Sequence, residues 1–338
     1  MKNISKIKNT AAGDPGIALL IVLWVLAILM VVVLSFSFMT RTETHATLSF
    51  KEGIEKKFIA EAGIERGIME IFFANFFNAN PNMIQEEGKE PWRTDGTGYS
   101  DKFGAGGYTV RITDESGKVD INMLNDASGI ILKNLLMNVA GVNEETADTI
   151  VDSALDWKDK NVGTHRLNGA GDEYYESLPN PYKVKHADFD TPEELMLVKG
   201  VTPEILYGTR DKKGIIDFLT VYSRSGSINV NAAPKEVLMA IPGITPEIAD
   251  QIISSREVKK ITNPSEVGIP AQSFPFIYYG SSSTFTIESV GSTGDEKTGY
   301  AIKAVVGGIE GGSKYKYLYY KAPVNMAKQV KNNGDSQP

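Results

Sequence analysis

An apolar run from Ile17 to Met39, without a charged side chain, constrains this chain more than any other feature. A helix of roughly 20 such residues crosses a bilayer core of ~30 Å. Each aliphatic residue near its centre favours insertion by roughly 0.3–0.6 kcal/mol, so the run as a whole enters a membrane. The short segment before it carries three lysines and one acid. This bias predicts a cytoplasmic N-terminus and an exported remainder.

The residues on either side of the run decide between two kinds of N-terminal signal. A cleaved secretory signal has an apolar core of about 7–15 residues, followed by a small-residue cleavage site. The polar residues that follow this run, beginning at Thr40, offer no such site. Asp14-Pro15-Gly16 instead resembles the leader of type IV prepilins, which a dedicated peptidase cuts after the glycine. The resemblance implies cleavage between Gly16 and Ile17.

Size and composition limit what the remainder can be. The chain has 338 residues, a net charge of −7 and no cysteine. About 300 residues lie outside the membrane run, enough for one large or two ordinary domains. The negative charge argues against long-range attraction to nucleic acid or anionic lipid. Without cysteine, any cross-linking of the fold must come from packing or a metal.

Helical periodicity continues past the apolar run. Apolar residues recur every four positions from Ala46 to Ala62, a series that includes Phe58. Further apolar residues add to one face: Ile59, Ile68, Met69, Phe72, Phe73 and Phe76. We predict one long helix over residues 17–77, with two helices broken near Arg41 as the alternative. Three glycines, each costing up to ~1 kcal/mol relative to alanine, indicate close packing or bends: Gly53, Gly63 and Gly67.

Strand patterns lie on both sides of a helical middle. Residues 80–98 are predicted to be a loop, and alternation over 108–122 predicts a β-hairpin or a strand and a turn. Three alternating segments predict an antiparallel meander: 284–290, 300–306 and 315–322. The fold class is therefore α+β, a long N-terminal helix packed on an antiparallel sheet with a large inserted α-helical domain.

The helical middle repeats one motif, a glycine between apolar residues followed by a helix that opens with Asn or Thr and an acid. The repeats centre on Gly141, Gly200 and Gly243 and are helix-hairpin-helix units. Such units most often bind DNA phosphates through hairpin amides and nearby Lys or Arg. Here acids flank the hairpins and Thr245 replaces the second glycine of the usual GxG. We favour a packing or protein-contact role, with a membrane-anchored DNA receptor of the competence type as the alternative.

An acid-rich segment separates the first two hairpins. Asp156, Asp159 and Asn161 end a predicted helix, and a glycine-rich turn brings back Asp172 and Glu173. Calcium takes about six to eight oxygens from such groups. The spacing of an EF-hand is missing, so the segment is either a calcium site of another kind or a solvated acidic loop. Its many aromatic and proline neighbours favour an ordered loop.

The sequence offers little for catalysis. It has three histidines and no cysteine, and it lacks G-x-S-x-G and the nucleotide-binding glycine patterns. We predict that the protein is not an enzyme. A hydrolase built on Asp and Glu alone is the remaining enzymatic alternative.

Seven segments, in order, resemble the K class of minor pseudopilins of the type II (general) secretion pathway. The similarity extends from Gly16 to about Ala322. One departure is Gly171, because the family commonly has GAED where this chain has GAGD, so an expected acid is missing or shifted to Glu173. The seven segments that resemble the family are GIALLIVLWVLAIL, AEAGIERG, DESGKVDIN, ALDWKDKN, GAGDEYYESLPNPYK, ELMLVKGV and INVNAAPKEVL.

The resemblance implies a pseudopilin fold with an inserted α-domain, at the tip of a short periplasmic pseudopilus whose assembly it nucleates. It implies other minor pseudopilins of the I and J classes, the major pseudopilin and prepilin peptidase as partners, and no nucleic acid. It also implies an N-methylated mature end and a single-pass anchor in the bacterial inner membrane, with the bulk of the chain in the periplasm. Calcium in the inserted domain would map onto the acid-rich segment: Asp156, Asp159, Asn161, Asp172 and Glu173.

The predicted organisation follows from these assignments. Residues 1–16 are a leader, 17–39 a transmembrane helix, 40–79 an amphipathic stem helix, 80–130 the first pilin-like part, 131–257 the inserted domain, 258–324 the C-terminal strands and 325–338 a disordered tail.

Ile21 stands at the fifth mature position, where most pilin-type subunits carry a glutamate. In the family that carboxylate pairs with the N-terminal amine of a neighbouring subunit. A lone carboxylate in a low-dielectric setting costs several kcal/mol unless it is paired. We hypothesise that Ile21 fits a subunit that has no predecessor, which is the first, tip position.

Overall fold

The computed structural model describes residues 15–79, 91–161, 163–280, 282–294, 299–308 and 314–324. Residues 1–14 of the predicted leader and the whole predicted tail therefore lie outside the described residues. The chain forms two compact units, one up to Glu55 and the other from Lys56 onwards.

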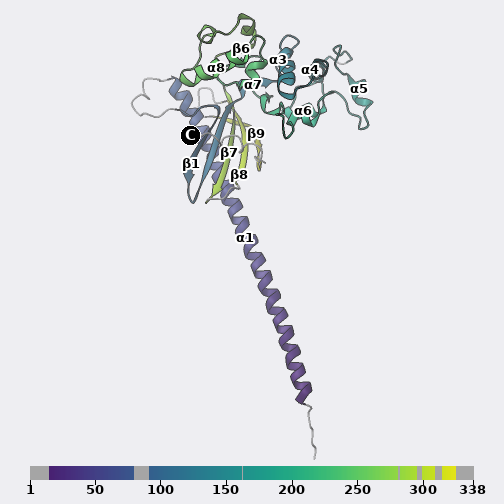
Figure 1. Ribbon diagram of the computed structural model, residues 1–338, viewed down its shortest axis with the longest axis vertical. Helices are drawn as coiled ribbons and strands as arrows, with labels where there is room; N and C mark the ends of the chain where they lie inside the picture. Colours follow the sequence, from purple (N-terminus) through teal and green to yellow (C-terminus); the bar gives the residue numbers. More distant parts are fainter. Residues whose placement is uncertain are drawn as a thin grey trace, which may run out of the picture. The chain divides into compact units, whose positions relative to one another are not determined.

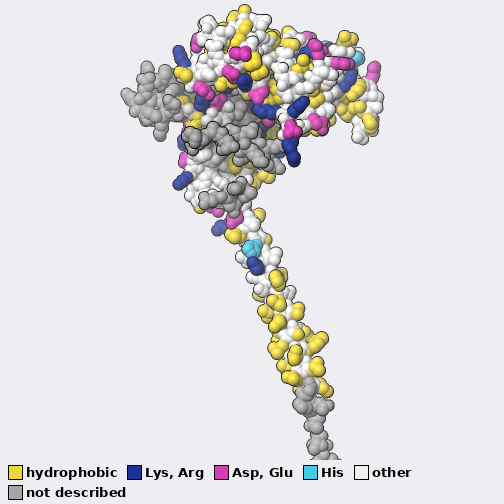
Figure 2. All heavy atoms as spheres, in the orientation of Figure 1, with side chains coloured by type: hydrophobic (Ala, Val, Ile, Leu, Met, Phe, Trp, Pro, Cys, Tyr) yellow, Lys and Arg dark blue, Asp and Glu magenta, His cyan; other side chains and the backbone are white. Residues whose placement is uncertain are grey.

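Helix α1 (Pro15–Ala79) is continuous, as the single-helix prediction requires, and the alternative of a break near Arg41 is wrong. In the first unit its large apolar side chains are all exposed, from 38% for Ile54 to 71% for Phe36. Figure 2 shows hydrophobic side chains over much of the visible face of the lower part of this helix. Among the described residues, this is the one helix long and apolar enough to cross a membrane, with a mean hydropathy of 3.4 over an 18-residue window.

The second unit is built on a five-stranded antiparallel sheet of order β1-β2-β7-β8-β9. The C-terminal meander is confirmed, and β2 joins it by pairing with β7. The strands are β1 (Asp95–Phe103), β2 (Gly106–Asp114), β7 (Thr284–Thr293), β8 (Tyr300–Gly307) and β9 (Lys316–Lys321).

Two local predictions need correction. Residues 95–98, predicted as loop, begin β1, because Gly96 adopts φ 91° and a register shift between Asp95 and Gly98 accommodates these turn-forming residues within the strand. Residues 108–122 form a strand and a turn, and the hairpin alternative is wrong. After the turn, β3 (Val119–Asp120) leaves the sheet and pairs in parallel with β4 (Leu219–Thr220).

The end of α1 packs on this sheet through a face that was predicted only in part. Ile59 and Ile68 are buried as expected, but Phe58, Met69 and Phe76 are not, with exposed fractions of 60%, 63% and 53%. The buried face is the one that contains Gly63 and Gly67, because the absence of a side chain at these positions lets the helix approach the sheet closely. The helix residues in this core are Ile59, Ala60, Ile64, Ile68 and Ile71, and the strand residues include Val110, Ile112, Ile287 and Ile302.

Three glycines set the closeness of that contact. A Cβ on Gly63 would lie 2.2 Å from Ser289 Oγ, and one on Gly67 would lie 2.9 Å from Ile287 Cγ2. On the strand side, a Cβ on Gly291 would lie 2.3 Å from the carbonyl oxygen of Lys56. The predicted role of helix glycines in close packing therefore holds at Gly63 and Gly67, whereas Gly53 has open space around it.

Between β2 and β7 the chain forms a helical part beyond one end of the sheet (Figure 1). Its α-helices are α3 (Gly129–Leu135), α4 (Glu144–Lys158), α5 (Asp172–Glu176), α6 (Pro203–Tyr207), α7 (Lys235–Ala240) and α8 (Pro246–Val258). A π-helical turn spans Leu136–Ala140, and 3-10 turns span Glu115–Gly117, Pro192–Leu197, Ile216–Phe218, Pro264–Val267 and Ala271–Phe276. Strands β5 (Ile228–Asn229) and β6 (Ile277–Tyr278) pair in parallel.

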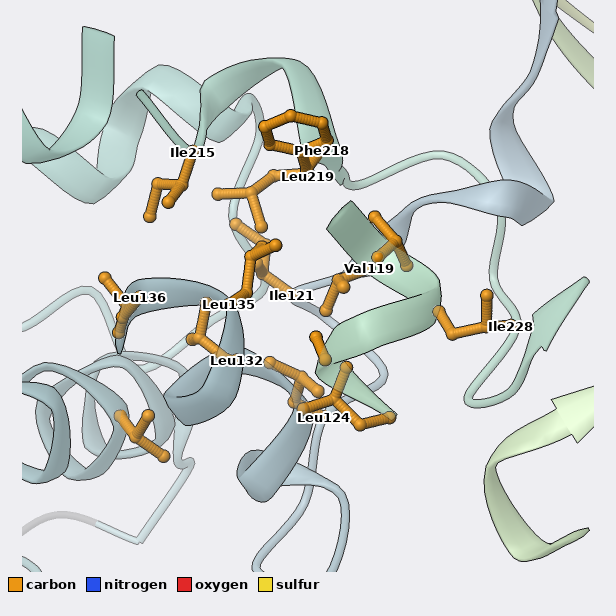
Figure 3. Packing of buried hydrophobic residues seen from close by; sticks show 14 of the residues in the cluster. Val119, Ile121, Leu124, Leu132, Leu135, Leu136, Ile215, Phe218, Leu219 and Ile228 are labelled. Atoms are coloured by element: carbon orange, nitrogen blue, oxygen red, sulfur yellow. The ribbon is translucent and has the colours of Figure 1, made fainter. Parts of the chain in front are cut away.

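A separate hydrophobic core supports the helical part. Figure 3 shows Leu132 and Leu135 of α3 in one cluster with Ile121 and Leu219. The cluster takes in residues from Val119 to Ile277, a wider span than the 131–257 predicted for the inserted domain. The second unit therefore has two hydrophobic cores. The segment that links them positions the helical part on the sheet.

Candidate functional site

The link between sheet and helical part is the segment DESGKVDIN, which directly follows β2. Glu115 is only 2% exposed, and its carboxylate accepts hydrogen bonds from Lys118 Nζ and Thr286 Oγ1, each at 2.6 Å. Burial alone would raise the pKa of Glu115, but the charge of Lys118 and hydrogen bonds from Lys118, Thr220 and Thr286 lower that pKa below its usual value. Because Thr286 lies on β7, this buried ion pair fastens the link to the sheet.

Two further buried acids shape the same segment. Asp114 accepts hydrogen bonds from the backbone N–H and the hydroxyl of Ser116, at 2.9 and 2.6 Å. Asp120 accepts from Ser223 Oγ at 3.0 Å and from the Arg224 N–H at 2.8 Å. Burial raises the pKa of both carboxyls. These bonds join β3 to the turn after β4. We did not predict this network. The available signal was the stretch DESGK at residues 114–118, which has two acids and one lysine and lies between the alternating apolar residues of two strands.

The acid-rich segment between the first two hairpins is folded against α4. Asp156 is 4% exposed, and both of its carboxylate oxygens accept from the backbone N–H of Arg166, at 3.2 and 3.0 Å. The Arg166 guanidinium also pairs with Asp156 Oδ1 at 2.8 Å. Asp159 lies 3.8 Å from the same guanidinium and accepts two hydrogen bonds from Asn161. The structure thus brings Asp156, Asp159 and Asn161 together, around an arginine.

The other two predicted ligands lie in α5. Asp172 accepts from the Val184 N–H at 2.9 Å, and its carboxylate is 3.9 Å from His186 Nε2. Glu173 is exposed. Within the described part of the chain, no three His, Asp or Glu side chains converge as a metal site would require. In this arrangement the residues do not fit a calcium ion, and calcium binding by the segment stays a prediction.

An aromatic cluster orders the segment. Trp157 is 2% exposed, and its ring centroid lies 5.4 Å from that of Tyr175 and 6.1 Å from that of Tyr182. The indole N–H of Trp157 donates to Glu194 at 2.9 Å. Aromatic pairs at these distances add about 0.5–1.5 kcal/mol each beyond their buried area. The segment is accordingly packed onto the helical part.

The three hairpin glycines share one backbone conformation. Gly141, Gly200 and Gly243 have φ of 67°, 85° and 87°, a region that side chains strain. Each precedes a helix with a side-chain cap that accepts from the third residue after it. The capping residues are Asn143, Thr202 and Thr245.

The hairpins face other parts of the protein. A Cβ on Gly200 would lie 3.0 Å from Ile150 Cγ1, and one on Gly243 would lie 2.2 Å from Gln272 Nε2. The first and third hairpin motifs are joined by Asn134, whose side-chain amide donates a hydrogen bond to the Ala240 carbonyl at 2.9 Å. These contacts support the packing role that we favoured for the hairpins.

Comparison with known proteins relates these features to one family. The family model described as "Type II secretion system (T2SS), protein K" matches residues 117–209, which include the end of the link, from Gly117 to Asn122, and the acid-rich segment. A curated relative from Pseudomonas aeruginosa, described as type II secretion system protein K, is 24% identical over 257 residues, 72% of this chain and 73% of the relative. These similarities support the identification of the chain as a protein K minor pseudopilin of type II secretion.

A solved structure agrees with the fold of this protein. A chain in the crystal structure of the GspK-GspI-GspJ complex from the enterotoxigenic Escherichia coli type 2 secretion system aligns with a TM-score of 0.57 and 12% identity. The match covers 84% of this chain and 100% of that chain. The α+β class, with a long N-terminal helix and an antiparallel sheet, is confirmed.

The same similarities bear on the main functional alternatives. They support a minor pseudopilin role in type II secretion, and the DNA-receptor alternative is not favoured. The family is a secretion family rather than a known class of enzyme. At the predicted processing site, Gly16 and Ile17 lie in the first turn of α1. Ile21 follows one turn later with 59% of its surface exposed, available to a bilayer or to another subunit.

Proposed function

We propose that this protein is the tip subunit of a type II secretion pseudopilus and nucleates its assembly with minor pseudopilins of the I and J classes and with the major pseudopilin. The carrying observation is the combination of an exposed apolar helix with a pilin-like sheet and a large helical part in one chain. The solved relative, by its title, forms a complex with GspI and GspJ. Assembly of this kind would support protein export across the outer membrane.

The placement of the helical part supports the tip position. It lies beyond the end of the sheet at which β2 ends and β7 begins (Figure 1). A subunit with so large a cap at one end of its sheet suits the end of a filament. Before assembly, the apolar part of α1 would hold the protein in the inner membrane, with the second unit in the periplasm.

Cleavage of the leader gives the direct test. The Gly16→Leu variant is expected to keep its leader and to reduce secretion to the level of a strain without the gene, because the peptidase requires the small residue before the cut. Intact-mass measurement of the membrane-extracted protein checks this, and the wild type should begin at an N-methylated Ile17. The Gly13→Leu variant, altered in the same leader, should be processed normally. Full secretion by a chain that still begins at Met1 would refute the proposal.

The fifth mature position tests the tip assignment separately. The Ile21→Glu variant is expected to assemble no better than wild type, since a tip subunit has no predecessor whose amine could pair with the new carboxylate. Pseudopilus assembly and secretion in a complemented strain are the measurements, with Ile21→Leu as the matched control. A marked gain in both with Ile21→Glu alone would show that a preceding subunit exists.

A further inference from the structure

The acid-rich segment already contains a cation. The Arg166 guanidinium contacts three carboxylates, with Nε 2.7 Å from Asp126 Oδ1 and Nη1 2.8 Å from Asp156 Oδ1 and 3.8 Å from Asp159 Oδ2. The planar fork of arginine suits several carboxylates at once. Two of these three acids, Asp156 and Asp159, are among the residues to which the family resemblance assigned calcium.

Two other oxygen donors of the segment also have protein partners. Asp152 accepts from the N–H and the side-chain amide of Asn168, both at 3.1 Å. The Gly169 carbonyl, an oxygen of the type that calcium uses, accepts from Lys199 Nζ at 3.1 Å. Gly169 itself lies so close to Asp156 that a Cβ there would be 1.7 Å from Oδ2. The oxygens are thus occupied by N–H groups and ammonium or guanidinium charge.

We infer that Arg166 takes the place of the calcium ion in this chain, so that the acid-rich segment is ordered without a metal. Asp156 is 4% exposed, and a buried carboxylate needs a partner charge to remain ionised. Arg166 supplies that charge together with its own backbone N–H, which closes the loop onto α4. A divalent cation at the same carboxylates would lie beside the guanidinium and be repelled by it.

The pKa directions agree with this geometry. Hydrogen bonding to Asp126 first, and then to Asp156, raises the pKa of Arg166 further above its usual value. The hydrogen bond and charge of Arg166 lower the pKa of Asp126. Both shifts stabilise the ionised forms of Arg166 and Asp126.

Thermal unfolding of the full chain in detergent tests the inference. We expect the wild-type midpoint to change by less than about 2 °C between millimolar EDTA and millimolar calcium chloride, because no ion is released. The Arg166→Gln variant should unfold roughly 5–10 °C lower in EDTA, since it leaves Asp156 buried and unpaired. The Lys213→Gln variant is the control: its ion pair with Glu236 is on the surface and should change the midpoint little.

A binding measurement keeps the test decisive if Arg166→Gln does not fold. Titration of metal-free wild-type protein with calcium chloride, followed calorimetrically, should show no site of submillimolar affinity. Saturable binding of calcium by wild type, or a wild-type midpoint several degrees lower in EDTA, would overturn the inference. An Arg166→Gln midpoint within about 2 °C of wild type would overturn it as well.

Discussion

Replacement of Lys118 by methionine is expected to lower the free energy of unfolding by about 3–5 kcal/mol at pH 7, because it leaves the Glu115 carboxylate buried without its partner charge. Glu115 is 2% exposed, and methionine preserves most of the packing of the lysine stem. The remaining hydrogen bonds from Thr220 and Thr286 cannot replace a full positive charge. Urea unfolding of the full chain in detergent is the measurement.

The size of this effect should depend on pH. In wild type the folded-state pKa of Glu115 is below its usual value, so the stability from the pair is present above that usual value and is lost as pH falls through the folded-state pKa. In the variant, burial without Lys118 raises the pKa of Glu115, and the carboxyl takes up a proton on acidification. The difference between the two proteins should therefore shrink from pH 7 to pH 5.

Two controls separate charge from packing. The Lys213→Met variant loses a pair whose lysine is 65% exposed, and it should cost less than about 1 kcal/mol. Adding Glu115→Gln to Lys118→Met removes the stranded charge and should restore part of the stability. If the double variant were no more stable than Lys118→Met alone, the loss would have to be assigned to packing.

Substitution of Gly291 by alanine is expected to destabilise the second unit by about 3 kcal/mol, through overpacking between α1 and β7. The new Cβ would lie 2.3 Å from the Lys56 carbonyl oxygen and 2.5 Å from the Ala60 nitrogen. Both are backbone atoms of α1, which cannot rotate away as a side chain could. Thermal unfolding in detergent and the steady-state level of the protein in cells measure the effect.

A glycine within α1 itself supplies the opposite expectation. Gly53 has nothing within 4 Å of its Cβ position, so Gly53→Ala should gain about 0.5–1 kcal/mol of helix stability. If Gly291→Ala left the midpoint unchanged or raised it, as Gly53→Ala is expected to do, the helix would not approach the sheet as closely as described.

Periodicity and family resemblance predicted the architecture well, because each rests on local pattern. The long helix, the meander and the glycine turns at Gly141, Gly200 and Gly243 follow from residues a few positions apart. The buried face of α1 did not follow fully from local pattern, since Phe58, Met69 and Phe76 were predicted on it and are exposed. The sheet selects the face on which Gly63 and Gly67 permit approach, and that choice requires knowledge of both surfaces.

The chemistry of the candidate site was harder to predict for the same reason. Asp156 and Asp159 were rightly singled out as neighbours, but Arg166 was not considered as their partner. Its role depends on a loop that folds back onto α4, which brings its guanidinium and its N–H to one carboxylate. Likewise, the pairing of Glu115 with Thr286 joins residues that are distant in sequence. Long-range contacts of this kind leave no spacing pattern.

The insertion between β2 and β7 has a consequence for the order of folding. Asp114 and Phe285 are partners in the ladder, although the whole helical part separates them along the chain. The entropy lost in joining two strands rises with the length of chain between them, and pairing of distant strands is slow. During synthesis β2 emerges long before β7, so its open edge waits without a partner. We therefore expect the helical part to fold first and, by drawing its two ends together, to act as an internal template for closing the sheet.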